Sequence, residues 1–356
     1  MRTAVVILNW NTKEYLERFL PGVLASAGKA DAEVIVADSA STDGSMALMA
    51  ERFPSVRTIP LSDNFGFTGG YNRALSALRD EGFAYYLLLN SDIEVPGDWL
   101  LPLTAWMDSH PDCGACAPKL HSWYDRDRFE YAGAAGGLLD RYGYPFCRGR
   151  VMSRVEEDEG QYDTPKDVFW VTGACLMVRS RLFHELGGLD PRFFAHMEEI
   201  DFCWRLQLAG YKVTVVPDAV VWHLGGGTLP QGSPWKLQLN YRNNLLMLEN
   251  NLARTLALRL GAKKGLRRAR RRIFERMVLD GMSAAVYLLT GKTAWFRAVR
   301  TAHREYRSLR HGPGLEEVKA YLKQATGVQI EGFYDHWMIP RALLAGNRIF
   351  RITRKM

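Results

Sequence analysis

Short apolar runs separated by polar, glycine-containing turns dominate the first ninety residues of the chain. The runs span residues 3–9, 33–37, 56–59 and 85–90. Because nearly every position in them is apolar, they are typical of strands buried on both faces of a sheet. The intervening segments, such as 12–26 and 46–52, repeat apolar residues at helical spacing. This alternation predicts a parallel, right-handed, doubly wound α/β sheet with helices on its faces.

Polar side chains follow several of these runs directly. Asn9 ends the first run, Asp38 ends the second, and Asn90-Ser91-Asp92 ends the fourth. Open α/β sheets bind their ligands at the carboxyl ends of the strands. Asp92 at such a position is suited to a hard divalent cation that is shared with substrate phosphates. The alternative is an Asx-type turn that caps the segment beginning near Pro96.

A glycine cluster at Asn64-Phe65-Gly66-Phe67-Thr68-Gly69-Gly70 precedes a helical pattern that continues to Leu78. It is not a G-x-G-x-x-G motif, and it follows a loop. One interpretation is a tight turn with a closely packed helix start. The other is close approach of the backbone to a ligand, with the helix N-terminus facing an anion.

Three carboxylates, Glu198, Glu199 and Asp201, lie within four residues and are bracketed by aromatic side chains. They can be favourable partners for the positive end of a helix. We favour a functional interpretation, because carboxylates in apolar surroundings acquire the raised pKa values that suit base catalysis. Upstream, residues 169–178 read as a further buried strand interrupted by Gly173.

A histidine, His223, ends the apolar run that begins near Lys212, and Gly225, Gly226 and Gly227 follow it closely. An isolated histidine is most often structural. The glycines favour a ligand role, because a flexible backbone allows close approach to a bound group.

The positive charge of the chain is concentrated in one segment. The chain has a net charge of +7, whereas residues 254–310 hold 16 Lys and Arg against three acidic residues, a local net charge of +13. The pattern from about Trp235 to Arg310 is helical, and its longest uncharged run has eleven residues, too short to span a bilayer. The alternatives are an anionic membrane surface, which we favour, packing within the chain or a homo-oligomer, and nucleic acid, which we do not expect.

Composition indicates a globular protein, with 47% hydrophobic and 24% charged residues. The five cysteines are an odd, scattered set, and residues 4–8 are too short for a secretory signal. We therefore expect a cytoplasmic protein, peripheral on the inner face of the cell membrane.

Blocks distributed from Ala4 to about Leu248 carry a family resemblance. They are VVILNWN (5–11), VADSASTDGS (36–45), NFGFTGGYN (64–72), LLLNSDIEV (87–95), FWVTGACLMVR (169–179), MEEIDFCWR (197–205) and VVWHLGGGT (220–228). In this order they resemble glycosyltransferase family 2, the inverting enzymes with the GT-A fold. More narrowly, they resemble its bacterial rhamnosyltransferase-like members. One block is weakly specific, and the ordered set is strongly specific.

The resemblance implies a donor site and a cation. Asp38 would contact the base or ribose of a nucleotide-sugar donor, with Asn9 and Asn11 lining the same pocket. Asn90 and Asp92 stand where the family carries its D-x-D-type motif, with Asp92 as the ligand of Mg²⁺ or Mn²⁺. Since Asn90 replaces the first Asp, the cation needs help from elsewhere.

The resemblance also implies a second metal ligand, a catalytic base and an acceptor site. His223 matches a position that supplies that help in some relatives. Glu199 aligns with the usual catalytic Asp and is one methylene longer, so Asp201 is an alternative base and Glu198 belongs to the same cluster. Trp170 and Gly173 match the block that floors the acceptor site, and Asn64 and Gly66 complete the donor site.

These residues predict a metal-dependent inverting glycosyltransferase that extends a glycan or lipid-linked glycan of the bacterial surface, from dTDP-rhamnose or a UDP-sugar. A single base distinguishes it from glycoside hydrolases, which use a pair of carboxylates. The rival hypotheses are a catalytically silent nucleotide- or glycan-binding protein and, more distantly, a nucleotidyltransferase. We expect a GT-A catalytic domain at 1–235, with a Rossmann-like, mostly parallel sheet, and a helical basic extension at 236–356.

Overall fold

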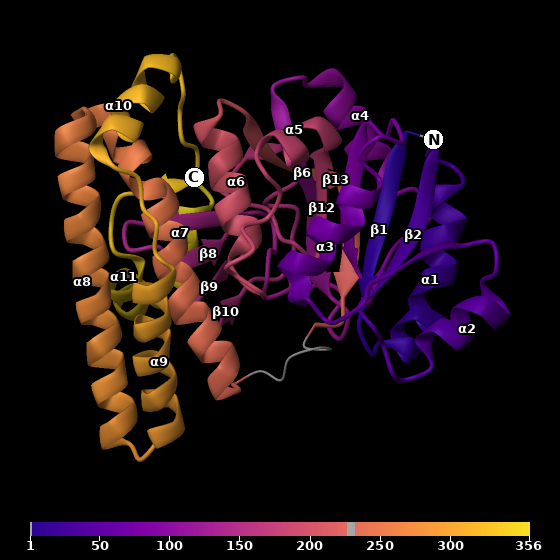
Figure 1. Ribbon diagram of the computed structural model, residues 1–356, viewed down its shortest axis with the longest axis horizontal. Coiled ribbons are helices and arrows are strands. Elements are labelled where there is room, and N and C mark those ends of the chain that lie inside the picture. The colour runs from indigo at the N-terminus through magenta and orange to yellow at the C-terminus, as the bar shows by residue number, and fades with distance from the viewer. Residues whose placement is uncertain (1, 226–231) are drawn as a thin grey trace.

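The computed structural model describes residues 2–225 and 232–356. An α/β half, which holds the N-terminus, lies beside a helical half formed by the later part of the chain (Figure 1). Gly226 and Gly227, the glycines that favoured a ligand role for His223, lie outside the described residues.

The main sheet has the strand order β11-β13-β6-β12-β4-β1-β2-β3, and β5 pairs with β13. Its strands are β1 (Thr3–Asn9), β2 (Ala32–Asp38), β3 (Arg57–Pro60), β4 (Tyr85–Asn90), β5 (Ile93–Glu94), β6 (Cys113–Ser122), β11 (Lys166–Asp167), β12 (Cys175–Arg179) and β13 (Lys212–His223). Strands β1, β2, β3 and β4 pair in parallel with one another, and β6 pairs in parallel with β13. Strand β12 runs antiparallel between β4 and β6, and the short β5 and β11 pair antiparallel with β13. The prediction of a mostly parallel sheet is therefore confirmed.

Helices cover both faces of this sheet. The helices on one face are α1 (Lys13–Ala27), α2 (Ser45–Arg52) and α4 (Leu100–Ser109), and those on the other are α3 (Gly66–Ala77), α5 (Ser180–Glu185) and α6 (Glu198–Leu208). Successive residues of one strand enter opposite layers, so Val5 and Ile7 pack with the first set while Ala4 and Val6 pack with the second. This alternation explains why β1, β2 and β4 are apolar at nearly every position. Strand β3 lies at the edge of the sheet and has no buried position, so the prediction that the run at 56–59 is buried on both faces is wrong.

A second, smaller sheet occupies the region where the sequence showed no regular pattern. Its order is β10-β9-β8-β7-β14. The strands are β7 (Gly137–Asp140), β8 (Pro145–Cys147), β9 (Arg150–Val151), β10 (Arg154–Val155) and β14 (Phe333–Tyr334). The C-terminal elements α11 (Met338–Ala345), η1 (Gly346–Ile349) and α12 (Phe350–Thr353) pack on it through Met338, Ile349 and Phe350.

The prediction of one strand over 169–178 is wrong. Strand β12 begins only at Cys175, and Trp170 pairs instead with Gly137 of the second sheet. Any side chain on Gly137 would collide with the Trp170 indole, because a Cβ there would lie 2.0 Å from its ring. The chain therefore changes sheets between Trp170 and Cys175.

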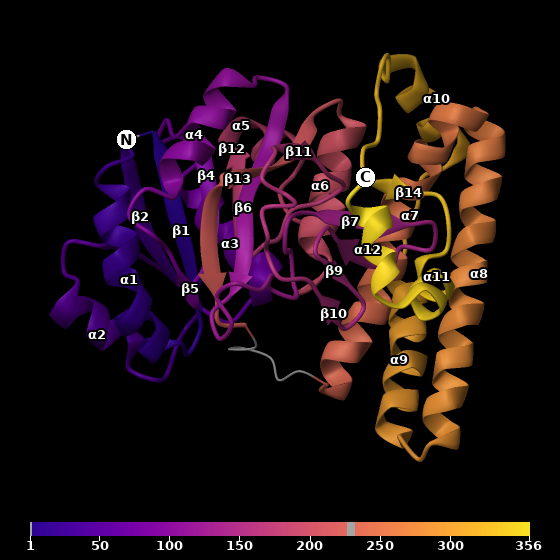
Figure 2. The same cartoon turned by 180° about the vertical axis from the view of Figure 1, so that it is seen from behind.

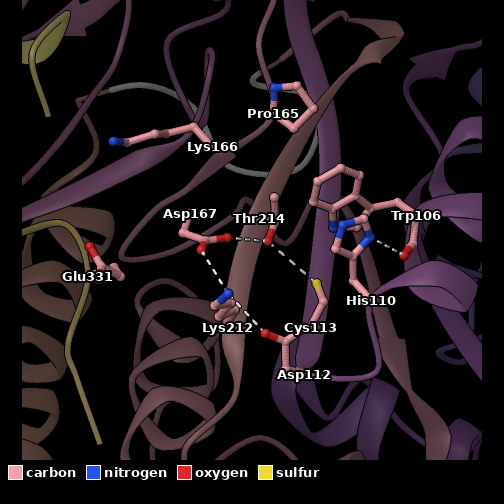
Figure 3. Close-up of a pocket in the computed structure, with 10 residues that line it drawn as sticks. All are labelled: Trp106, His110, Asp112, Cys113, Pro165, Lys166, Asp167, Lys212, Thr214 and Glu331. Carbon is pink, nitrogen blue, oxygen red and sulfur yellow. Dashed lines mark hydrogen bonds and ion pairs between the residues drawn. The ribbon is translucent and has the colours of Figure 1, made fainter.

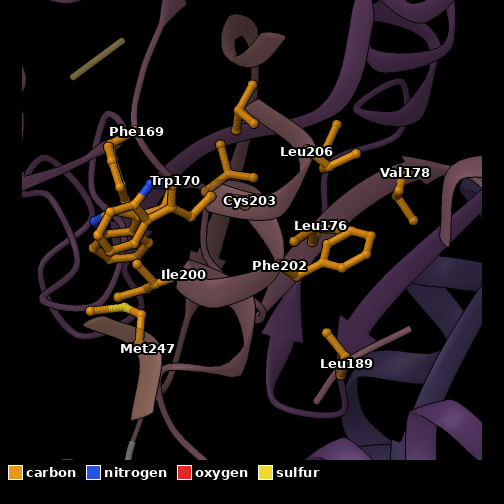
Figure 4. Close-up of a cluster of buried hydrophobic side chains, with 14 of the residues drawn as sticks. Phe169, Trp170, Leu176, Val178, Leu189, Ile200, Phe202, Cys203, Leu206 and Met247 are labelled. Atoms are coloured by element: carbon orange, nitrogen blue, oxygen red, sulfur yellow. The ribbon is translucent and has the colours of Figure 1, made fainter. Parts of the chain in front are cut away.

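The helical half begins at α7 (Pro234–Leu260) and continues through α8 (Ala262–Leu289), α9 (Thr293–Leu309) and α10 (Leu315–Gln324). It shares a core with the α/β half: Met247 of α7 packs near Ile200 and Cys203 of α6 (Figure 4). The proposed boundary after residue 235 thus falls at the beginning of a helix that is packed on the sheet layer. Within residues 2–225 and 232–356, no helix combines the length and apolarity needed to cross a membrane.

Candidate active site

A cavity of about 380 Å³ opens at the carboxyl ends of β1, β4 and β13, next to the beginnings of α6 and α7. Among the residues predicted from the sequence, its lining includes Asn64, Gly66, Asn90, Asp92, Gly173, Glu198, Glu199 and His223. Several sequence blocks, up to 160 residues apart, therefore meet at one site. The place is the one that strand polarity predicts for a ligand.

Asp92 and His223 form a buried pair in this cavity. His223 Nε2 lies 3.2 Å from Asp92 Oδ1, and His223 Nδ1 lies 3.5 Å from Oε1 of Glu130. Burial opposes charge on Asp92, but the charge and hydrogen bond of His223 outweigh it and lower the pKa of Asp92. Burial likewise opposes charge on His223, whose pKa is nevertheless raised to about 10 by Asp92 and Glu130. At neutral pH the pair is therefore ionised.

The chemistry of this pair fits a divalent cation that arrives with its substrate. A carboxylate and an imidazole are ligands for Mn²⁺, and a carboxylate alone suits Mg²⁺. In the part of the chain that the structure describes, no group of three or more His, Cys, Asp and Glu side chains is arranged to hold a metal ion. Phosphate oxygens of a substrate would have to complete the coordination, as they commonly do for Mg²⁺. His223 would have to lose its proton to coordinate, since only neutral imidazole binds a metal.

Glu198 and Glu199 begin α6 and present their carboxyl groups to the same cavity. Their Oε2 atoms are buried and lack a hydrogen-bond partner among the described residues. Burial raises the pKa of Glu199 to about 7. Burial and the neighbouring charge of Glu199 raise the pKa of Glu198 well above its usual range. Both carboxyl groups therefore keep their protons to higher pH than exposed glutamates do.

The segment before these glutamates is strained. Phe194, His196 and Met197 have φ angles of 66°, 72° and 72°, in the left-handed region that side chains rarely occupy. Asn243 of α7 holds this segment: its Nδ2 donates hydrogen bonds of 2.8–3.0 Å to the carbonyl oxygens of Phe193, Ala195 and His196. Since Asn243 is completely buried, the helical half directly fixes the backbone that delivers the glutamates.

The predicted donor residues Asn9, Asn11 and Asp38 form one network beside the cavity. Asn9 Nδ2 donates to Asp38 Oδ1 at 2.7 Å, and Asp38 Oδ2 accepts from the backbone N–H of Ser41 at 2.9 Å. Asn11 Oδ1 accepts from the backbone N–H of Thr42 at 2.7 Å. The structure brings these residues together, at the edge of the cavity and not in its wall.

The glycine cluster forms the tight turn and closely packed helix start of its first interpretation, and it places Gly66 at the cavity. Gly66 has a φ of 69°, lines the cavity, and would clash with the carbonyl oxygen of Phe194 at 2.6 Å if it carried a Cβ. Asn64 Oδ1 accepts a hydrogen bond from the backbone N–H of Gly66 at 2.9 Å. Gly70, in contrast, leaves room for Leu8, whose side chain a Cβ would meet at 2.7 Å.

Two predicted residues lie elsewhere. Asp201 is completely buried, away from the cavity, and accepts hydrogen bonds from Arg205, Asn250 and Asn251 at 2.8–2.9 Å. With its oxygens so engaged it is a structural residue, which corrects its assignment as an alternative base. Trp170 is also buried, and its Nε1 donates to the carbonyl oxygen of Leu138, so it supports the second sheet and does not line the cavity. This corrects its assignment to the acceptor site.

Other residues of the cavity were not predicted. Glu130, His196, Trp235 and Lys236 line it. Burial lowers the pKa of Lys236, and burial and the charge of Lys236 lower the pKa of His196 to about 4. These residues stand in segments without a recognisable motif. The residues predicted from the sequence included no cationic partner for a diphosphate. That gap was the signal that could have led to these residues.

A second cavity, of about 390 Å³, lies at the amino ends of β6 and β13 (Figure 3). Three of its charged groups are paired: Lys212 contacts Asp112 at 2.9 Å and Asp167 at 3.8 Å. Thr214 Oγ1 donates to Asp167 at 2.7 Å. Because this cavity lies at the amino ends of the strands, it is at the wrong edge of the sheet for a ligand site of this fold.

Comparisons with known proteins identify a family for this chain. Residues 4–187, half of the chain, match Glycosyl transferase family 2. The chain is 28% identical over 297 residues to an N-acetylglucosaminyl-diphospho-decaprenol L-rhamnosyltransferase of Mycobacterium tuberculosis, covering 75% of this chain and 95% of that protein. It is 27% identical over 164 residues to the rhamnosyltransferase WbbL of Escherichia coli, covering 43% and 58%.

A solved structure supports the fold. GalNAc-T7, crystallised with UDP, GalNAc and Mn²⁺, superposes with a TM-score of 0.50 at 18% identity, over 65% of this chain and 45% of that chain. The GT-A fold expected from the sequence is thereby confirmed. The matched family and the rhamnosyltransferase relatives lead to one conclusion: this chain belongs to glycosyl transferase family 2.

Proposed function

We propose that the protein is a metal-dependent, inverting glycosyltransferase of cell-surface polysaccharide synthesis. In this proposal it moves a sugar from a nucleotide-diphosphate sugar, dTDP-rhamnose or a UDP-sugar, to a lipid-linked glycan. The observation that carries the proposal is that Glu199 and the Asp92–His223 pair face one cavity at the carboxyl edge of the sheet. A base and an anionic metal site in one cavity are the parts that this reaction needs.

Glu199 is the proposed base. Its carboxylate takes the proton of the acceptor hydroxyl while that oxygen attacks the anomeric carbon from the side opposite the nucleotide. The bond to the nucleoside diphosphate breaks, so the configuration inverts. A pKa raised to about 7 by burial makes this carboxylate a stronger base than an exposed glutamate and leaves it largely ionised above pH 7.

The diphosphate end of the donor is proposed to lie against Asp92, His223 and Lys236. Asp92 and His223 would hold the cation, which when bound neutralises charge on the leaving diphosphate. Lys236, half-buried at the start of α7, contributes a further positive charge. The network of Asn9, Asn11 and Asp38 lies on the side where the base and ribose would extend.

Relatives support the substrate classes. One relative is named for rhamnosyl transfer to N-acetylglucosaminyl-diphospho-decaprenol and another as a rhamnosyltransferase. The aromatic side chains at the cavity, including Tyr131, Phe194 and Trp235, suit stacking against sugar rings or a lipid diphosphate's first isoprenoid units. The acceptor is therefore proposed to be a sugar attached to a polyprenyl diphosphate.

The test is release of nucleoside diphosphate by the purified full chain. dTDP-rhamnose and a panel of UDP-sugars are offered with a short-chain N-acetylglucosaminyl-diphospho-lipid, in Mn²⁺, in Mg²⁺ or in a chelator. We expect release that needs both acceptor and cation, that is lost in Asp92→Asn, and that survives in the matched control Asp80→Asn, at an exposed aspartate. Donor binding without release from any pair would make the protein a silent binder, and pyrophosphate release from a nucleoside triphosphate would make it a nucleotidyltransferase.

A further inference from the structure

The C-terminal half of α8 exposes a stripe of apolar side chains: Phe274, Val278, Met282, Val286 and Leu289. Phe274 is 67% exposed, Met282 61% and Leu289 86%. The spacing of three or four residues places them on one side of the helix, over roughly 22 Å. The opposite side of α8 packs on α7 and α9, and α8 forms the outer edge of the molecule (Figures 1 and 2). The stripe is therefore apolar surface that α7 and α9 leave uncovered, and it needs a partner.

A basic cavity of about 520 Å³ lies at the N-terminal end of the same helix. Its charged lining is Arg259, Lys264, Arg267, Arg268, Arg271, Arg272 and Asp335. Arg272 is buried and donates to Asp335 at 2.6 Å, but its Nε and Nη1 groups have no hydrogen-bond partner within the described chain. A buried guanidinium with free N–H groups among other cations indicates a site for an anion such as a phosphate.

The cavity and the stripe share one side of α8. Arg267 and Arg271 precede Phe274 by seven and three residues, which is two turns and one turn of the helix. On the neighbouring helix α9, exposed arginines recur at positions 297, 300, 304 and 307. We call the side with Lys264, Arg267, Arg271 and the apolar stripe the outer face of α8.

We propose that the outer face of α8 is a docking surface for an anionic phospholipid bilayer. Headgroup phosphates bind in the basic cavity and along the α9 arginines, and the stripe from Phe274 to Leu289 enters the boundary between headgroups and acyl chains. An interfacial helix with this separation of charge and apolar surface binds in that way.

A second copy of this chain and nucleic acid each fit this surface less well than an anionic bilayer does. The acidic residues of α8 and α9 are Glu275, Asp280 and Glu305, and each already contacts an arginine of this chain. A second copy would therefore set cations against cations. Nucleic acid would satisfy the arginines but leave the apolar stripe in water, whereas an anionic bilayer satisfies both.

Aromatic contacts run from the C-terminal end of α8 toward the catalytic cavity. The ring of Trp295, at the start of α9, lies 5.4 Å from that of Tyr287 near the end of α8, and approaches Gly232 just before α7. Trp235, three residues further, lines the cavity and packs on Phe194 at 5.5 Å. The role of this path rests on the proposed function. In that function, these aromatic side chains lead from the bilayer to the site where a lipid-linked acceptor reacts.

Sedimentation with vesicles tests the docking surface on the full chain. Vesicles of phosphatidylcholine with 30% phosphatidylglycerol are compared with pure phosphatidylcholine, at low and high salt. The double variant Lys264→Gln/Arg267→Gln should partition about 25-fold more weakly, since each charge contributes about fivefold. Met282→Glu should weaken binding more than tenfold, by placing a carboxylate in the acyl boundary. The matched controls are Lys29→Gln/Arg79→Gln and Leu101→Glu, in the α/β half, which should bind like the unmutated protein.

Several results would overturn the proposal. They are equal binding to both vesicles, no binding by the unmutated protein, equal losses in the controls, or a dimer in solution that Met282→Glu dissociates. Nucleotide release with the soluble short-chain acceptor separates this proposal from the function. Variants that lose vesicle binding should keep that release. Absence of release in every form, with vesicle binding intact, would refute the function and leave the docking surface standing.

Discussion

Replacing Glu199 by Gln should inactivate the protein and, above pH 7, stabilise it. Gln has nearly the same shape but no charge. In the folded chain Glu199 lies in the first turn of α6 at the cavity wall, where burial disfavours its ionised form. The charge of Glu199 is needed for the reaction but opposes folding. Its removal should therefore lower activity and raise stability.

The size of the stability effect follows from the pKa. Burial raises the pKa of Glu199 from 4.5 to about 7, so the folded chain holds a proton that the unfolded chain has released between these pH values. The contribution of Glu199 to the free energy of unfolding is therefore highest below pH 4.5, falls as the pH rises toward 7, and stays reduced above it. The full difference corresponds to at most about 3 kcal/mol, because the half-buried side chain keeps some access to water.

Urea unfolding at pH 5 and pH 8 measures this effect. The gain in unfolding free energy of Glu199→Gln over the unmutated chain should be about 2 kcal/mol larger at pH 8 than at pH 5. The matched control is Glu51→Gln, at an exposed glutamate of α2, for which the gain should not depend on pH. An equal gain of Glu199→Gln at both pH values would refute the argument that burial controls this carboxyl group.

The same variant is assayed for nucleotide release. Turnover should fall by about 10²–10⁴-fold, the size of a general-base contribution. Donor affinity should barely change, because the base meets the acceptor and not the nucleotide. In the unmutated enzyme, turnover should rise with pH through about 7, as Glu199 loses its proton. Near-normal turnover of Glu199→Gln would remove Glu199 as the base.

Three further changes test the rest of the site. Asp92→Asn should abolish cation-dependent release while circular dichroism shows an intact fold, and near-normal release at saturating cation would contradict this. His223→Ala should raise the cation concentration for half-maximal release by about tenfold or more, whereas an unchanged titration would make His223 structural. Asn243→Ala should lower the free energy of unfolding by about 1–3 kcal/mol, since buried carbonyl oxygens lose their donors. It should also lower kcat more than it changes the KM for the donor. An unchanged kcat would show that the strained segment before Glu198 has no influence on catalysis.

Sequence alone determined the sheet and the strand tips. Strands buried on both faces are apolar almost throughout, and this local pattern placed β1, β2 and β4 and therefore the edge that carries Asp92. The order of the sequence blocks indicated the family. The short strands of the second sheet escaped detection, because two to four residues are too few for a period to show.

Tertiary structure decided which polar groups act together. Glu199 and Asp201 are two residues apart, but each residue turns a helix by about 100°, so Glu199 faces the cavity while Asp201 faces Asn250 and Asn251. Glu130 and Lys236 enter the site from segments more than 100 residues apart, and no local pattern encodes that meeting. The outer face of α8 emerged in the same way: the apolar side chains of a helix that stay exposed are known only after its neighbours have packed.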